Sequence, residues 1–110
     1  MLGAVALEDI GHHFPDTDPQ YSNIDSTILL SRVADLVAEQ GYSLVNADIT
    51  LLLQRPKIAP YIQQMREKIA EVLKVDKDCI SVKATTTEKL GFVGREEGVA
   101  SYATVLLEKQ

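Results

Sequence analysis

The chain contains no tryptophan, and aromatic residues make up only 5% of its 110 residues. Leucine, isoleucine, valine and alanine must therefore supply the core. Cys79 is the only cysteine, which excludes an internal disulfide and a cysteine-based metal cluster. Its place in an apolar strand pattern predicts a small buried core residue, not a reactive thiol.

Basic charge is also scarce, since the net charge is −5 and the pI is about 4.9. Nucleic acids and anionic membranes attract proteins through a basic face, so the composition argues against both as partners. A local basic pocket for a phosphate remains compatible with this charge. The apolar start, residues 1–7, is too short to span a bilayer and lacks the basic residues of a signal peptide. We therefore expect a cytoplasmic protein.

The residues that are present suit one folded domain over residues 1–110, because 45% are apolar and 25% are charged. Apolar spacing predicts the order helix, helix, strand, helix, strand, strand. These elements are expected at residues 2–10, 26–40, 44–53, 60–73, 79–84 and 99–107. We expect the helices to cover one face of a small, mixed or mostly antiparallel sheet, which is an α+β architecture.

The expected helix boundaries differ in quality. Asp25 offers a cap for the second helix, Gly41 closes it, and Pro60 suits the first turn of the third. Gly11 would end the first helix, but no capping residue precedes its apolar residues. The sequence thus predicts a chain that opens inside a helix, with a preceding segment missing.

The first group of candidate functional residues lies in a long loop over residues 11–23 and just before it. Three carboxylates, Asp9, Asp16 and Asp18, lie within ten residues of each other, together with His12 and His13. Acidic loops coordinate Mg²⁺ or Ca²⁺, and the histidines and aspartates of this loop could together form a metal site. A solvated turn held by Asx hydrogen bonds is the alternative. The EF-hand pattern is absent.

The second group is the basic turn Gln54–Lys57, between a strand and a helix. Arg55 and Lys57 next to a helix N-terminus predict a phosphate site, through charge and the helix dipole together. An exposed basic turn without a ligand is the alternative.

The third group runs from Lys83 to Glu88, with hydroxyls at Thr85–Thr87, and continues over residues 91–95 in a polar loop that contains three glycines. Hydroxyls at a strand end can donate to phosphate oxygens, and glycine lets backbone N–H groups come close. A threonine-rich strand end without function is the alternative. Neither a Walker loop nor Gly-x-Ser-x-Gly occurs.

The segments DIGHHFPDTDP, QRPKIAPYI, VKATTTEKLGF and VGREEG, in this order and spacing, resemble the 2-C-methyl-D-erythritol 2,4-cyclodiphosphate synthases. The match runs from Leu2 to Leu107. It implies a homotrimer with active sites between subunits. It also implies a protein of the bacterial cytoplasm. It also implies a lyase of non-mevalonate isoprenoid biosynthesis, which cyclises 4-diphosphocytidyl-2-C-methyl-D-erythritol 2-phosphate and releases CMP. The implied cofactors are zinc, which orients the attacking phosphate, and Mg²⁺ or Mn²⁺ on the diphosphate.

The resemblance assigns a role to each group. Asp9, Ile10 and Gly11 would contact the erythritol and phosphate part, and Thr86 would polarise the reacting phosphate. A flexible substrate loop would consist of Phe14, Pro15, Asp16, Thr17 and Asp18. The cytidine pocket of the neighbouring subunit would consist of Leu53, Gln54, Arg55, Pro56, Lys57, Ile58 and Ala59. Thr85, Thr87 and Glu88 would contact the nucleotide and diphosphate, and Phe92 and Arg95, with Glu97, would face the substrate or the trimer axis.

The chain departs from the family pattern in several places. The family's zinc ligands, an Asp-x-His and a later His, precede the point where this sequence starts, as does the first strand of the sheet. No residue is therefore assigned to a metal. Glu8 and Glu96 replace common glycines and would repel phosphate if they pointed into the site. The alternative function is a metal-free trimeric binding or scaffold protein of the same fold.

Overall fold

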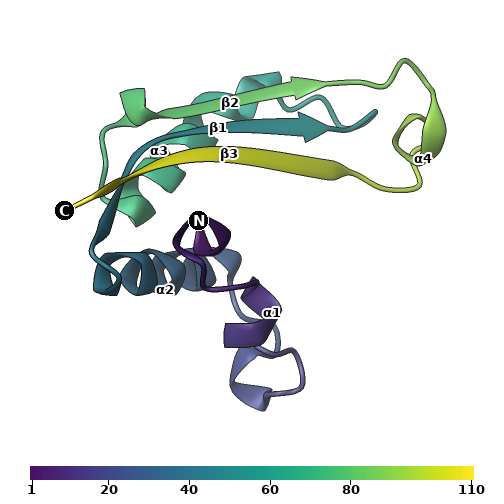
Figure 1. Cartoon of the computed structure of the whole chain (residues 1–110). Coiled ribbons are helices and arrows are strands. Elements are labelled where there is room, and N and C mark those ends of the chain that lie inside the picture. The colour runs from purple at the N-terminus through teal and green to yellow at the C-terminus, as the bar shows by residue number, and fades with distance from the viewer.

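The computed structural model describes all 110 residues and contains a three-stranded sheet with two long helices (Figure 1). The long elements are α2 (Ser26–Glu39), β1 (Tyr42–Leu52), α3 (Ile62–Leu73), β2 (Ile80–Thr85) and β3 (Ala100–Lys109). Short turns of helix connect them: η1 (Leu2–Val5), α1 (Ile10–His13), η2 (Pro19–Tyr21), η3 (Ala59–Tyr61), η4 (Lys77–Cys79) and α4 (Gly91–Gly94).

The sheet has the order β2-β1-β3 and is mixed. β1 runs parallel to β2, with Leu52 opposite Thr85, and antiparallel to β3, with Leu52 opposite Ala100. Both long helices lie on the same side of the sheet (Figure 1). The expected α+β class, the mixed sheet and the one-sided helices are thus confirmed.

Two apolar clusters hold these layers together. In the larger one, Ala70 of α3 packs on Ala47, Ile80 and Val82 of the sheet. The smaller one joins Leu2 of η1 to Val33 and Val37 of α2. Only nine of the 110 residues are buried, so much apolar surface stays exposed in the single chain.

The local signals for the long elements are confirmed. The Asp25 carboxylate accepts a hydrogen bond from the backbone N–H of Thr27 at 2.8 Å, which satisfies a free donor at the start of α2. Gly41 follows α2 with φ 84°, a conformation that glycine adopts without strain. Pro60 lies in η3, directly before α3. None of the helices is long and apolar enough to cross a membrane.

The predicted first helix over residues 2–10 is wrong. The chain leaves the helix after Val5, because Ala6 (φ 60°) and Glu8 (φ 67°) adopt left-handed conformations that no α-helix contains. A new turn then starts at Asp9, whose carboxylate accepts from the N–H of His12 at 2.8 Å. Gly11 consequently lies inside α1 and ends no helix.

Two smaller predictions also need correction. Cys79 ends η4 and is only half-buried, so it belongs neither to a strand nor to the fully buried core. Its N–H donates to the Asp76 carbonyl at 2.9 Å, and this turn delays the start of β2 to Ile80. The loops predicted over residues 11–23 and 85–98 contain the short helical turns η2 and α4.

Candidate functional site

The second and third predicted groups meet at one edge of the sheet. Because β1 and β2 are parallel neighbours, the segments that follow them leave the sheet side by side. The N–H of Leu53 donates to the Thr85 carbonyl at 3.1 Å, which extends this pairing by one residue. A cavity of about 180 Å³ lies between the two segments. Its lining consists of Leu53, Gln54, Pro56, Lys57, Ile58, Ala59, Ala84, Thr85 and Thr86.

The turn after β2 is held by its own hydroxyls. Thr86 Oγ1 accepts from the N–H of Glu88 at 3.3 Å, and Thr87 Oγ1 donates to the Leu90 carbonyl at 2.6 Å. A hydroxyl that accepts one hydrogen bond still has its own proton to donate. Thr86, which lines the cavity, can therefore donate to a ligand oxygen, whereas the proton of Thr87 is already used.

Lys57 is the only cation that lines the cavity, and it forms no ion pair within the chain. Arg55, in contrast, lies outside the lining and pairs with Glu96, with Nε and Oε1 3.1 Å apart. Arg95 pairs with Glu97 at 2.9 Å. Positive charge for an anionic ligand in this cavity thus comes first from Lys57.

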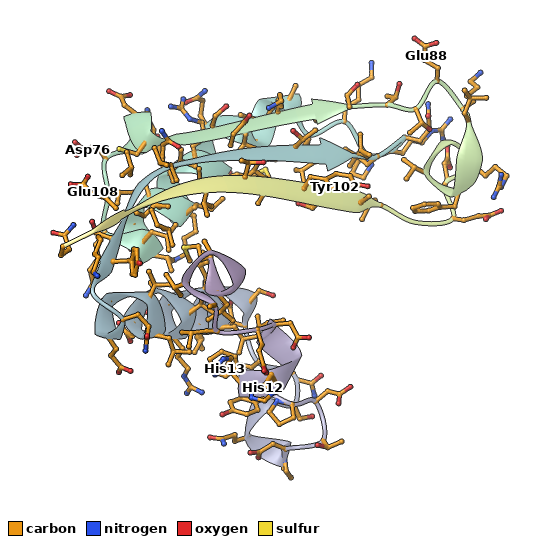
Figure 2. All side chains as sticks on the ribbon, viewed as in Figure 1. His12, His13, Asp76, Glu88, Tyr102 and Glu108 are labelled. Atoms are coloured by element: carbon orange, nitrogen blue, oxygen red, sulfur yellow. The ribbon has the colours of Figure 1, made fainter.

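The first predicted group lies elsewhere. The loop around α1 and the turn around α4 occupy different ends of the molecule (Figure 1), and Figure 2 shows His12 and His13 far from Glu88. Asp9 and Ile10 instead line a cavity of about 590 Å³ between the helices and the sheet, whose walls are mostly apolar. One copy of the chain does not join the first group to the other two.

Hydrogen bonds order the loop of the first group. The Asp18 carboxylate accepts from the side chain of Gln20 at 2.9 Å and from its backbone N–H at 3.1 Å, and these bonds lower the pKa of Asp18 below its usual value. Phe14 packs edge-on against Tyr21, with ring centroids 5.4 Å apart. Asp16 and Thr17 are exposed between these contacts, and Pro15 is half-buried.

The two histidines are engaged separately. His12 Nδ1 lies 2.8 Å from a carboxylate oxygen of Glu8, and His13 Nε2 lies 2.6 Å from the Leu7 carbonyl. No three side chains of histidine, cysteine, aspartate or glutamate come together as a metal centre would require. The residues of this chain do not fit the zinc site that the resemblance implies. Glu8 and Glu96 each pair with a basic side chain, and neither lines the cavity at the ends of β1 and β2.

Comparison with known proteins shows to which family the chain belongs. The model of the YgbB family matches residues 1–108. The chain belongs to the YgbB family. A relative from Bacillus pumilus (strain SAFR-032), named 2-C-methyl-D-erythritol 2,4-cyclodiphosphate synthase, is 62% identical over 109 residues, which are 99% of this chain and 69% of the relative. A relative of the same name from Bacillus cytotoxicus is 59% identical over the same shares.

Solved structures of YgbB relatives agree. The bifunctional IspDF from Campylobacter jejuni matches 99% of the chain with a TM-score of 0.95 and 47% identity, over 30% of its own length. The Plasmodium falciparum IspF in complex with CDP matches 99% of the chain with a TM-score of 0.86 and 34% identity, over 65% of its own length. A cyclodiphosphate synthase in a CDP-bound form gives a TM-score of 0.88 at 33% identity, over 97% of this chain and 69% of its own.

Two members of the third group have roles in this YgbB chain that the sequence alone does not assign. Ala84 lines the cavity, although a small residue in a strand gives no chemical signal. Gly94 is buried beneath the turn after β2, and the sequence shows only one of three glycines in a polar loop. Phe92 and Arg95 lie on and after α4, outside the cavity lining, with Phe92 about half exposed.

Proposed function

We propose that this YgbB chain is a 2-C-methyl-D-erythritol 2,4-cyclodiphosphate synthase whose cavity at the ends of β1 and β2 binds the cytidine diphosphate part of its substrate. The observation that carries the proposal is the meeting of two predicted groups, from residues 53–59 and 85–86, around one cavity. Two relatives with the same fold are CDP complexes. The names of the curated relatives support the same activity.

The proposed reaction is an internal phosphoryl transfer in 4-diphosphocytidyl-2-C-methyl-D-erythritol 2-phosphate. An oxygen of the 2-phosphate forms a bond to the β-phosphorus. The bond from this phosphorus to the bridging oxygen breaks, and CMP leaves with that oxygen. No protein nucleophile takes part, so positioning and charge stabilisation carry the catalysis.

The geometry suggests a division of labour among the residues. The backbone and apolar side chains of residues 53–59 would enclose the cytosine, and Lys57 would face the diphosphate. The Thr86 hydroxyl, whose proton is free, would donate to the reacting phosphate. Thr85 and Glu88 would complete the nucleotide contacts, whereas Thr87 would act by holding the turn.

The first group, Asp9 to Gly11 with the loop Phe14–Asp18, would bind the erythritol part in a neighbouring copy's site. One chain keeps it apart from the cavity, so this role requires the proposed homotrimer. Phe92 and Arg95, with Glu97, would face the axis of that trimer. Zinc and Mg²⁺ or Mn²⁺ enter the proposal as added components of the assay, because the described side chains form no metal centre. The proposed location is the bacterial cytoplasm.

The test measures CDP binding by calorimetry and CMP release from the cytidyl substrate in the presence of Zn²⁺ and Mg²⁺. We expect the chain to bind CDP. CMP and cytidine triphosphate should bind more weakly, and purine nucleotides should not bind. Lack of CDP binding would contradict the proposed function. CDP binding without CMP release would support the alternative of a binding protein with this fold.

A further inference from the structure

Gly94 is buried at the end of α4 and lies directly against the backbone of Lys89. A Cβ atom at this position would lie 2.5 Å from the Lys89 Cα and 2.7 Å from its carbonyl oxygen. Real Cβ atoms essentially never come so close to other heavy atoms. The obstructing atoms are backbone, so no side-chain rotation can relieve the overlap. Only glycine fits this contact without moving the chain.

Lys89 belongs to the turn that presents the threonine hydroxyls. Its N–H donates to Oε1 of Gln54, a residue of the opposite cavity wall, at 3.4 Å. The next residue is Leu90. Its carbonyl accepts a hydrogen bond from the Thr87 hydroxyl at 2.6 Å, and its N–H donates to the Thr87 carbonyl at 3.1 Å. Gly94 completes the series, because its N–H donates to the Leu90 carbonyl at 3.0 Å.

The turn itself has little freedom to absorb a displacement. Glu88 and Lys89 both adopt left-handed conformations, with φ 53° and 68°, which side-chain-bearing residues rarely occupy. A push on Lys89 from Gly94 would therefore displace the turn relative to Gln54. The spacing between the Thr86 hydroxyl and the other cavity wall depends on this packing.

We propose that Gly94 is a positioning residue for the nucleotide cavity: its missing side chain lets α4 pack against Lys89 and so fixes the Thr86 turn relative to Gln54. The inference rests on the proposed function for its ligand. Gly94 touches no substrate and acts through the turn alone.

The test compares Gly94→Ala with a glycine control, Gly3→Ala, in the full chain. At Gly3 an added Cβ meets nothing within 4 Å. We expect Gly94→Ala to weaken CDP binding by about tenfold or more, since a misplacement of about 1 Å can cost about 100-fold in a reaction that depends on positioning. Gly3→Ala should bind CDP like the wild type.

A second ligand separates positioning from general damage. Cytidine lacks the diphosphate that the Thr86 turn would contact, so Gly94→Ala should weaken cytidine binding much less than CDP binding. Circular dichroism and a thermal melt establish that the variant is folded. Unchanged CDP affinity, an equal loss for both ligands, or global unfolding of Gly94→Ala would each overturn the inference. A wild-type chain that failed to bind CDP would instead overturn the proposed function, and amide NMR shifts of Thr85–Thr87 in Gly94→Ala would still decide whether the turn moves.

Discussion

At the scale of single residues, Thr86 has a hydroxyl whose proton has no acceptor within the chain and can therefore bind a ligand. It accepts from the Glu88 N–H and lines the cavity, so a ligand oxygen is the partner left for its proton. Removal of this hydroxyl would delete one donor to the ligand and also the acceptor of the Glu88 N–H, which is exposed. Its effect should appear mainly in binding and turnover, because the lost contact lies in an exposed turn.

We predict that Thr86→Val weakens CDP binding by about tenfold or more, because a hydrogen bond to a charged group is worth ~1.5–3 kcal/mol. Calorimetry with CDP measures this change. Thr86→Ser, which keeps the hydroxyl, is the matched control and should bind CDP nearly like the wild type. Equal affinities of the two variants would remove the Thr86 hydroxyl from the site.

The sequence predicted the chemistry of these residues better than their contacts. The basic turn and the threonines could be singled out because each follows a recognisable strand. The pairing of Arg55 with Glu96 could not, because the two residues lie far apart in the sequence and meet only through the fold. For the same reason Lys57, and not Arg55, turned out to be the cation that lines the cavity.

At the scale of elements, the sequence predicts best where local signals determine the structure. It predicts α2 and the strands to within a few residues, because caps, glycine and alternation all act over short distances. The predicted first helix is wrong because its apolar spacing is helical, whereas Ala6 and Glu8 adopt left-handed conformations. The residue types alanine and glutamate do not indicate these conformations, and Leu2 packs on α2 beside them.

The cap of α2 gives a prediction about pH. Hydrogen bonds from the backbone and side chain of Thr27 lower the pKa of Asp25 below its ordinary value of 3.8. A carboxyl with a lowered pKa in the folded state stabilises the fold above the unfolded pKa, and this contribution disappears as the pH falls through the folded pKa. We expect the difference in melting temperature between wild type and Asp25→Ala to be full at pH 7 and to shrink below pH 4.

Asp25→Asn tests the cause. Its amide oxygen can still accept from the Thr27 N–H, so it should retain most of the stability at pH 7. It cannot titrate, so its melting temperature should fall less than that of the wild type on acidification. Parallel pH profiles of wild type and Asp25→Asn would show that Asp25 does not contribute to the acid sensitivity.

Arg66 connects three elements. From α3 its Nε donates to the Ile80 carbonyl of β2 at 2.7 Å, and its Nη2 donates to the Lys77 carbonyl of η4 at 3.1 Å. We predict that Arg66→Met lowers the free energy of unfolding by about 1–3 kcal/mol, because these backbone carbonyls lose charged donors. Urea denaturation measures the change. Gln64→Met, an exposed position on the same helix, should leave the midpoint nearly unchanged, and an equal shift in both variants would contradict the role of Arg66.

At the scale of the whole molecule, the exposed apolar surface has a definite location. Ala103 and Val105 of β3 line the cavity beneath the helices, so strand alternation places Tyr102 and Leu106 on the opposite face of the sheet. Their residues are 65% and 54% exposed, and Figure 2 shows Tyr102 on β3. No element of the same chain covers this face. Large exposed apolar side chains on a sheet commonly mark an association surface.

This surface supports the proposed homotrimer, which makes its own prediction. Sedimentation velocity of the wild type should show a species of three chains. Glutamate at both positions, in Tyr102→Glu with Leu106→Glu, would place charges in the buried contact and should shift the chain to monomers. Tyr61→Glu is the matched control, because Tyr61 is similarly exposed, at 55%, but lies in η3 away from the sheet. If the double variant sedimented like the control, association would have to use another surface.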